Sequence, residues 1–124
     1  SDTVTPMAII SFDCHGNIST FSPELLTANH APYGTFIFGN VFKNALEDIF
    51  QNEHFRAIHA AIKQGIAQCQ ETCDYYQVCG GGSASNKILE NGSFASTETR
   101  HCRLRIKTTV SAIVDYLEQQ YSVE

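Results

Sequence analysis

The sequence has few basic residues and no long hydrophobic segment. Its 124 residues include eight Lys plus Arg against thirteen Asp plus Glu, which gives a formal charge of −5. Because nucleic-acid binding needs a basic surface, this balance argues against a nucleic-acid partner. No run of 18 apolar residues is present, so we expect no membrane-spanning helix. The length and the 43% hydrophobic content are typical of one globular domain.

The start of the chain lacks two further features. Residues 1–6 have neither the basic region nor the apolar region of a signal peptide. Position 1 is not Met, so we expect either a processed chain or a piece of a longer protein. The chain has five cysteines, whereas a secreted disulfide-bonded domain usually has an even number and a signal. We therefore expect a cytoplasmic protein, with a secreted disulfide-bonded domain as the less favoured alternative.

The first half of the sequence predicts a β-hairpin followed by helices. Strands are expected at residues 7–12 and 17–21, on either side of a turn. Asn40 is expected to cap a helix over residues 41–50. A second helix is expected over residues 53–67, because Phe55, Ile58, Ile62 and Ile66 then share one face.

The second half predicts an irregular segment and a closing helix. Residues 69–102 contain clustered cysteines, a glycine run and turn signals, so we expect mostly loop there. Residues 108–121 have the periodicity of an amphipathic helix. Its expected buried stripe consists of Val110, Ile113, Val114, Leu117 and Tyr121. The chain as a whole, residues 1–124, is predicted to be a single α+β domain.

Four of the five cysteines, Cys69, Cys73, Cys79 and Cys102, carry the strongest functional signal and are called the site cysteines below. The first three follow a C-x3-C-x5-C pattern, and the fourth comes 23 positions later. Four thiolates are a full ligand set for a [4Fe–4S] cluster and also for structural zinc. Zinc sites usually combine two short Cys pairs, and Cys102 stands alone, so the pattern favours iron–sulfur while zinc stays open.

Two further features are the glycine run that follows Cys79 and the fifth cysteine. Gly80, Gly81 and Gly82 would let backbone N–H groups approach an anionic cluster, and a flexible loop is the alternative interpretation. The fifth cysteine, Cys14, lies apart in the hairpin turn. We expect it to be a small, partly buried hydrophobic residue.

The motifs together resemble a known family. The segments are Cys-x3-Cys-Asp-Tyr-Tyr-Gln-Val-Cys-Gly-Gly-Gly at 69–82, Asn-Lys at 86–87, Glu-Asn-Gly-Ser-Phe at 90–94, Thr-Glu-Thr at 97–99 and Cys-Arg at 102–103. With Gly-Asn-Ile-Ser-Thr-Phe-Ser-Pro-Glu-Leu at 16–25 and Gly-Asn-Val at 39–41, they make residues 7–107 resemble the SPASM domain. SPASM is the C-terminal auxiliary-cluster domain of radical S-adenosylmethionine (SAM) enzymes that modify ribosomally made peptides. The likeness is strongest to the branch of the GRRM peptide maturases and cyclophane-forming enzymes.

The resemblance implies one [4Fe–4S] cluster held entirely by the site cysteines, although the first gap is one residue longer than in the family. The family has a second auxiliary cluster, and two of its ligand positions are Phe21 and Ser83 here. We therefore expect that second cluster to be lost. A cluster with four protein ligands favours electron transfer or structural support over Lewis-acid chemistry.

The family's SAM-cleaving unit is a separate N-terminal barrel with a C-x3-C-x2-C motif, which this chain lacks. The resemblance therefore implies that this chain is not catalytic by itself. Its expected partners are a barrel domain of the same enzyme and a ribosomal precursor peptide. Four charged residues near the site cysteines are candidates for tuning the cluster or contacting the peptide, with ordinary solvation or ion pairing as the alternative. They are Lys87, Glu90, Glu98 and Arg103.

Overall fold

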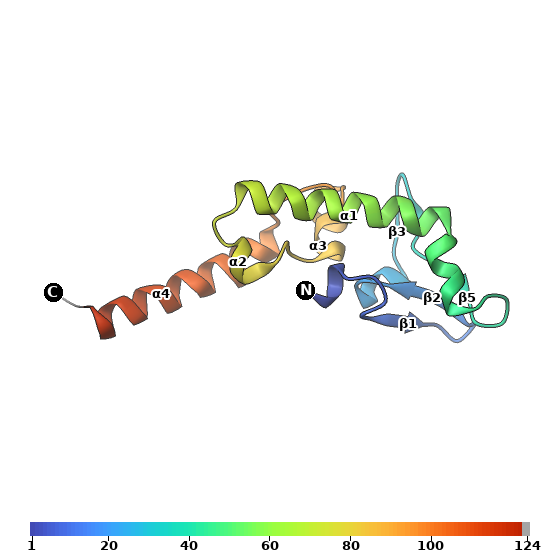
Figure 1. Ribbon diagram of the computed structural model, residues 1–124, viewed down its shortest axis with the longest axis horizontal. Coiled ribbons are helices and arrows are strands. Elements are labelled where there is room, and N and C mark those ends of the chain that lie inside the picture. Colours follow the sequence, from blue (N-terminus) through green and yellow to red (C-terminus); the bar gives the residue numbers. More distant parts are fainter. Residues whose placement is uncertain (123–124) are drawn as a thin grey trace.

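The fold is α+β, as predicted, and the computed structural model describes residues 1–122 (Figure 1). The first half contains η1 (Asp2–Val4), β1 (Ile10–Phe12), β2 (Asn17–Thr20), η2 (Pro23–Leu26), β3 (Asn29–His30), β4 (Gly34–Thr35), β5 (Gly39–Asn40) and η3 (Leu46–Gln51). The second half contains α1 (Glu53–Thr72), α2 (Tyr76–Cys79), α3 (Ala84–Asn91), η4 (Cys102–Lys107) and α4 (Thr108–Tyr121). The η elements are 3-10 helices, except that η4 is a π-helix.

The predicted hairpin is present and gains a third strand. β1 pairs with β2 in antiparallel register, and β5 adds to the free side of β2. β1 begins at Ile10 and not at residue 7. Met7 has a positive φ of 61°, and its N–H donates to the Thr20 hydroxyl at 2.9 Å. The first part of the predicted strand therefore bends away from the sheet, since a positive φ is incompatible with extended backbone.

The helix predicted for residues 41–50 is wrong. The structure has a turn there, followed by the short 3-10 helix η3. The Asn40 side chain accepts a hydrogen bond from the Phe42 N–H at 2.9 Å, and the Asn44 side chain accepts one from the Asn40 N–H at 3.1 Å. The Asn40 carbonyl accepts from the N–H groups of Lys43 and Asn44 at 3.0 and 2.8 Å, so Asn40 caps a single turn that does not continue as a helix. The 3-10 helix η3 begins only where the Asp48 carboxylate accepts from the Ala45 N–H at 3.0 Å.

α1 has the predicted buried face and extends further than predicted. Phe55, Ile58 and Ile62 are fully or almost fully buried. The Asn52 side chain caps the helix by accepting from the Phe55 N–H at 2.9 Å. Because α1 continues to Thr72, it links the hydrophobic core to the segment that contains the site cysteines (Figure 1).

The hydrophobic core contains a group of stacked aromatic rings. Phe21 stacks on Phe55 with ring centroids 5.7 Å apart, and Phe94 meets Phe36 edge to face at 5.6 Å. Such pairs add to the free energy gained by burying their apolar surface. The core residues are Val4, Ile18, Phe21, Leu25, Phe36, Phe38, Ile49, Phe55, Ile58, Ile62, Ala84, Ile88 and Phe94.

The segment 69–102, predicted to be mostly loop, contains the end of α1 and all of α2 and α3, and η4 begins at its last residue. Cys14 is also not as predicted, because it is exposed in the hairpin turn. Its turn is organised by the neighbouring Asp13 carboxylate, which accepts from the N–H groups of His15 and Asn17 at 2.8 and 3.0 Å. Local polar bonding thus holds this turn, and no apolar pocket forms around the Cys14 thiol.

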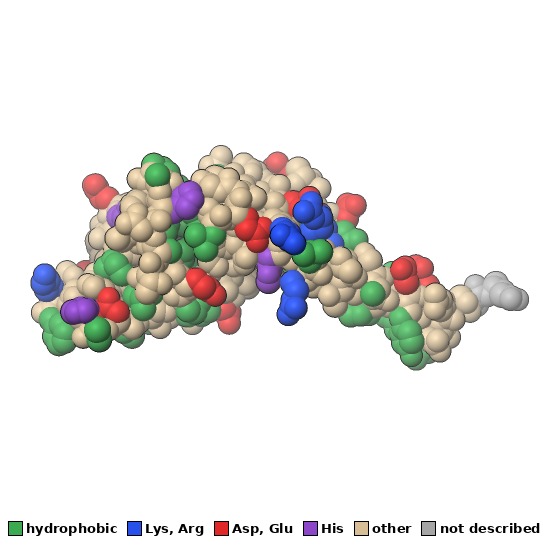
Figure 2. Space-filling model, turned by 180° about the vertical axis from the view of Figure 1, so that it is seen from behind, with side chains coloured by type: hydrophobic (Ala, Val, Ile, Leu, Met, Phe, Trp, Pro, Cys, Tyr) green, Lys and Arg blue, Asp and Glu red, His purple; other side chains and the backbone are tan. Residues whose placement is uncertain are grey.

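α4 has the predicted bounds, but its apolar stripe is not buried. The helix extends from the body as an arm (Figure 1), and apolar side chains follow the underside of this arm (Figure 2). Ile113, Val114, Leu117 and Tyr121 are all exposed, and no residue of α4 is buried. Periodicity correctly predicts an apolar face, but nothing within residues 1–122 buries it. None of the helices described is long and apolar enough to cross a membrane.

We predict that Phe94→Ala destabilises the fold by about 3–5 kcal/mol, since it removes a fully buried ring from the aromatic core. Urea unfolding followed by circular dichroism measures the change. Phe42→Ala is the matched control because Phe42 is 81% exposed, and its effect should stay within about 0.5 kcal/mol. Equal effects of the two substitutions would contradict this description of the core.

We also predict that Gly65→Ala destabilises the protein, although Ala in a helix interior normally gains about 0.5–1 kcal/mol over Gly. A Cβ at position 65 would collide with the carbonyl oxygen of Phe94 and lie 3.1 Å from that of Ser96. The same urea unfolding measures the change. Ala67→Gly, at an exposed position of α1, should show the ordinary loss of about 1 kcal/mol. A stabilising Gly65→Ala would rule out this close approach.

Candidate metal centre

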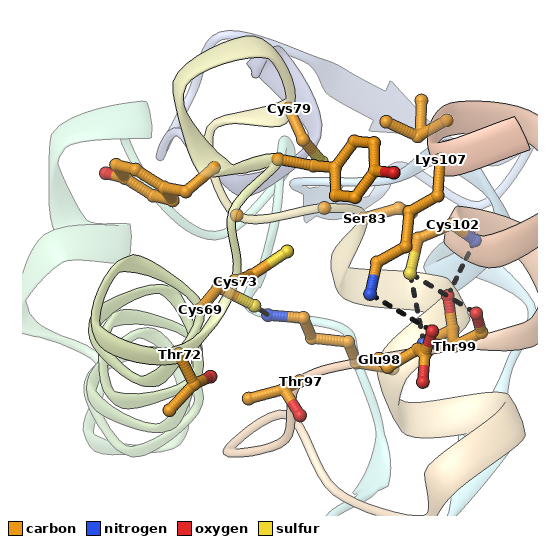
Figure 3. Close-up of a pocket in the computed structure, with 16 residues that line it drawn as sticks. Cys69, Thr72, Cys73, Cys79, Ser83, Thr97, Glu98, Thr99, Cys102 and Lys107 are labelled. Atoms are coloured by element: carbon orange, nitrogen blue, oxygen red, sulfur yellow. Dashed lines mark hydrogen bonds and ion pairs between the residues drawn. The ribbon is translucent and has the colours of Figure 1, made fainter. Parts of the chain in front are cut away.

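The four site cysteines line one cavity of about 200 Å³ (Figure 3). Cys69 lies in the last turn of α1, and Cys73 ends that helix with its N–H donating to the Cys69 carbonyl at 2.9 Å. Cys79 is the last residue of α2, and Cys102 is the first residue of η4. The fold therefore brings Cys102 back to the three thiols that precede it in the chain.

The thiols are spread around the cavity and are not drawn to one point. In Figure 3, Cys69 and Cys73 lie on one side and Cys102 on the opposite side. Among residues 1–122, no three Cys, His, Asp or Glu side chains are arranged to hold a metal ion. Tetrahedral zinc would require sulfurs about 3.8 Å apart, given its Zn–S bond of about 2.3 Å. A four-iron cluster takes one thiolate on each iron, so its ligands surround a larger volume.

Two of the sulfurs accept hydrogen bonds from groups beside the cavity. The Lys87 side chain donates to Cys69 Sγ at 3.4 Å, and the Thr99 N–H donates to Cys102 Sγ at 3.3 Å. Cys102 Sγ in turn donates to the Thr99 carbonyl at 3.2 Å. Thr99 also accepts from the Cys102 N–H through its hydroxyl at 3.0 Å, which fixes the start of the last helical segment. All five cysteines are free thiols, so no disulfide competes for the site. The donor chemistry of the cavity therefore fits a thiolate-ligated iron–sulfur cluster.

The glycine run forms a turn in which all three residues have a positive φ. Gly80 ends α2 with a φ of 71°, and Gly81 and Gly82 continue at 106° and 82°. Any Cβ at Gly81 would lie 2.9 Å from the side chain of Ile66 on α1. Gly81 and Gly82 line the cavity, whereas Gly80 is not among its lining residues.

The four charged candidates divide between two places. Lys87 and Glu98 line the cavity, whereas Glu90 and Arg103 line a neighbouring groove that Glu98 also borders. The Glu90 carboxylate accepts a hydrogen bond from the Arg100 N–H and so caps the final helical segment. Glu90 therefore has a structural partner, and Lys87 is the candidate closest to the thiols.

Sequence reasoning gave no role to several residues of the cavity, among them Lys107 and Thr99. Lys107 Nζ lies 3.1 Å from a Glu98 carboxylate oxygen and 5.6 Å from the centre of the Tyr75 ring. The hydrogen bond to Glu98 raises the pKa of Lys107 above its usual range. No spacing rule predicts that contact, whereas Thr99 could have been found as a Thr three residues before Cys102 at a helix start.

Phe21 and Ser83, which occupy two ligand positions of the family's second cluster, lie in different parts of the structure. Phe21 is fully buried and belongs to the aromatic core, while Ser83 lines the cavity of the site cysteines. Cys14 lies in the hairpin turn, with its sulfur 3.4 Å from His15 Nδ1. The sulfur donors of the cavity are therefore the four site cysteines.

No family model and no solved structure matches the chain. Over 119 residues, the chain is 48% identical to an uncharacterized protein of Synechocystis. The match covers 96% of this chain and 30% of that relative. This chain therefore spans less than a third of the length of the relative that it matches, and resembles a segment of a longer protein.

Proposed function

We propose that this chain is the auxiliary-cluster domain of a radical SAM enzyme that modifies a ribosomally made peptide. The observation that supports a cluster is the group of four free thiols, drawn from separate elements, around one cavity with donors directed at two sulfurs. The enzyme class rests on the resemblance of residues 7–107 to the SPASM domain. Free thiols fit a reducing compartment, so the proposal includes a cytoplasmic location.

The chain's own residues would hold the cluster and control its surroundings. A bound [4Fe–4S] cluster supplies one-electron transfer. Around it, Thr99 and Lys87 donate hydrogen bonds to sulfur, while Tyr75, Tyr76 and Ile106 line the cavity and limit the access of water. These residues offer no SAM-cleaving motif, so the chain would support a catalyst located elsewhere in the enzyme. Its contribution would be electron transfer, positioning of the peptide, or both.

The exposed apolar stripe of α4 supports the proposal that another part of a longer polypeptide packs against this helix. α4 has an apolar face without buried residues, and the matched relative contains more than twice as much sequence outside the match as inside it. The helix is anchored to the cavity wall by the hydrogen bond between Tyr75 Oη and Ser111 Oγ at 2.7 Å. We propose that the stripe is covered by the remainder of that longer polypeptide, which in this proposal is a barrel domain. The barrel would then lie beside the thiol-lined cavity.

Anaerobic reconstitution with iron and sulfide tests the cluster directly. The chain is expected to bind about four iron and four sulfide and to absorb at about 400 nm. Cys102→Ala should lose most of this iron because it removes one of the four ligands. Cys14→Ala is the matched control and should retain the full content, since Cys14 lies outside the cavity.

Two results would overturn the cluster proposal. One is a colourless protein that binds a single zinc ion and takes up no iron under anaerobic conditions, which would indicate a structural zinc module. The other is equal loss of iron in the Cys14 and Cys102 variants. Purification in air is not a substitute, because oxidised clusters are lost and their free thiols then bind zinc or oxidise further.

Hydrogen–deuterium exchange tests the assignment of α4. In the full-length Synechocystis relative, amides aligned with residues 110–121 should exchange more slowly than in the matched segment expressed alone, because docking protects the helix. Lysines at the positions aligned with Ile113 and Leu117 should restore fast exchange in the full-length protein. Lysines at the positions aligned with Ala112 and Gln119, which lie off the stripe, should not. Equal exchange in the segment and the full-length protein would contradict docking.

A further inference from the structure

Lys87 is a buried lysine that forms no ion pair with an acidic side chain of residues 1–122. Its side chain is 3% exposed and comes from α3, in the wall of the cavity. Its amine donates to Cys69 Sγ at 3.4 Å. Gly65 makes room for the side chain, since a Cβ there would lie 3.3 Å from its Nζ.

The charge of this amine is not neutralised by a carboxylate. The one salt bridge among residues 1–122 joins Lys107 to Glu98, and both of those side chains are partly exposed. An ammonium group has three N–H donors, and the hydrogen bond found for Lys87 goes to a weak sulfur acceptor. Burying a charge is unfavourable unless an opposite charge is close by. The side chain is therefore suited to an anion held in the same cavity.

We infer that Lys87 is the fixed counter-charge of the anionic group bound by the site cysteines and that it raises the reduction potential of that group. The inference rests on the proposed function. Each added electron increases the negative charge beside Lys87, so a buried positive charge stabilises the reduced form more than the oxidised form. Lys107 has a smaller effect, because its charge is already paired with Glu98 and is reached by solvent.

Redox titration of the reconstituted chain tests this role. The midpoint potential is followed under anaerobic conditions by the electron paramagnetic resonance signal of the reduced cluster. Lys87→Met keeps most of the side-chain volume and removes the charge. At a fixed potential it should lower the ratio of reduced to oxidised cluster about tenfold, which corresponds to a midpoint about 59 mV lower for one electron. Lys87→Arg should stay closer to the unsubstituted chain because the charge is kept.

Lys43→Met is the matched control. It makes the same change in net charge at an exposed residue of the turn before η3, outside the cavity. Its midpoint should equal that of the unsubstituted chain. If Lys87→Met loses its cluster, Lys87→Gln takes its place in the titration. A midpoint that is unchanged or raised in a fully loaded Lys87 variant would overturn the inference.

Metal content separates failure of the inference from failure of the proposed function. If the unsubstituted chain takes up no iron and sulfide, both are overturned. If every variant is loaded and only the expected shift of the midpoint is missing, the proposed function stands and the role of Lys87 falls. Urea unfolding of the metal-free protein adds a second readout. Lys87→Met should be at least as stable as the unsubstituted chain there, and an equal loss of stability in the metal-free and loaded forms would indicate a packing role instead.

Discussion

The close approach of the chain after Phe94 to helix α1 is the constraint on which the rest of the structure depends. It is possible because Gly65 has no side chain, so the backbone of Phe94 and Ser96 can lie directly against the helix. That contact continues on one side into the aromatic core through the buried ring of Phe94. On the other side the chain passes directly to Glu98 and Thr99, which line the cavity. Gly65 thus fixes the position of the segment that joins the aromatic core to the thiol-lined cavity.

Helix α1 joins two environments of opposite character. Its first half packs Phe55, Ile58 and Ile62 into the core, where burial of apolar surface stabilises the fold. Its last turn carries Cys69 into a cavity lined by thiols, hydroxyls and charged groups. The core therefore holds the helix in place without help from the cysteines. This division allows the cavity to be polar and reactive while the stability of the fold comes from elsewhere in the molecule.

The sequence predicted the parts of the fold that depend on local patterns. The hairpin, the buried face of α1 and the bounds of α4 follow from periodicity and turn residues. The helix predicted at 41–50 is wrong because the cap at Asn40 starts only one turn, and the next helical segment begins at Leu46. The ligand spacing indicated the four site cysteines, but Lys107 meets Glu98 only through the tertiary fold. A pattern in one segment does not reveal which distant segment will face it.

The arm formed by α4 is continuous with one wall of the cavity. Lys107 joins η4 to α4 without a break in helical backbone, so Cys102 and the exposed stripe belong to one rod. Near the root of that rod, Ser111 is hydrogen-bonded to Tyr75 in the segment between Cys73 and Cys79. Under the proposed function, a partner that tilts the arm would therefore also shift Cys102 relative to the other thiols. Docking of the arm and loading of the thiols would then be coupled equilibria.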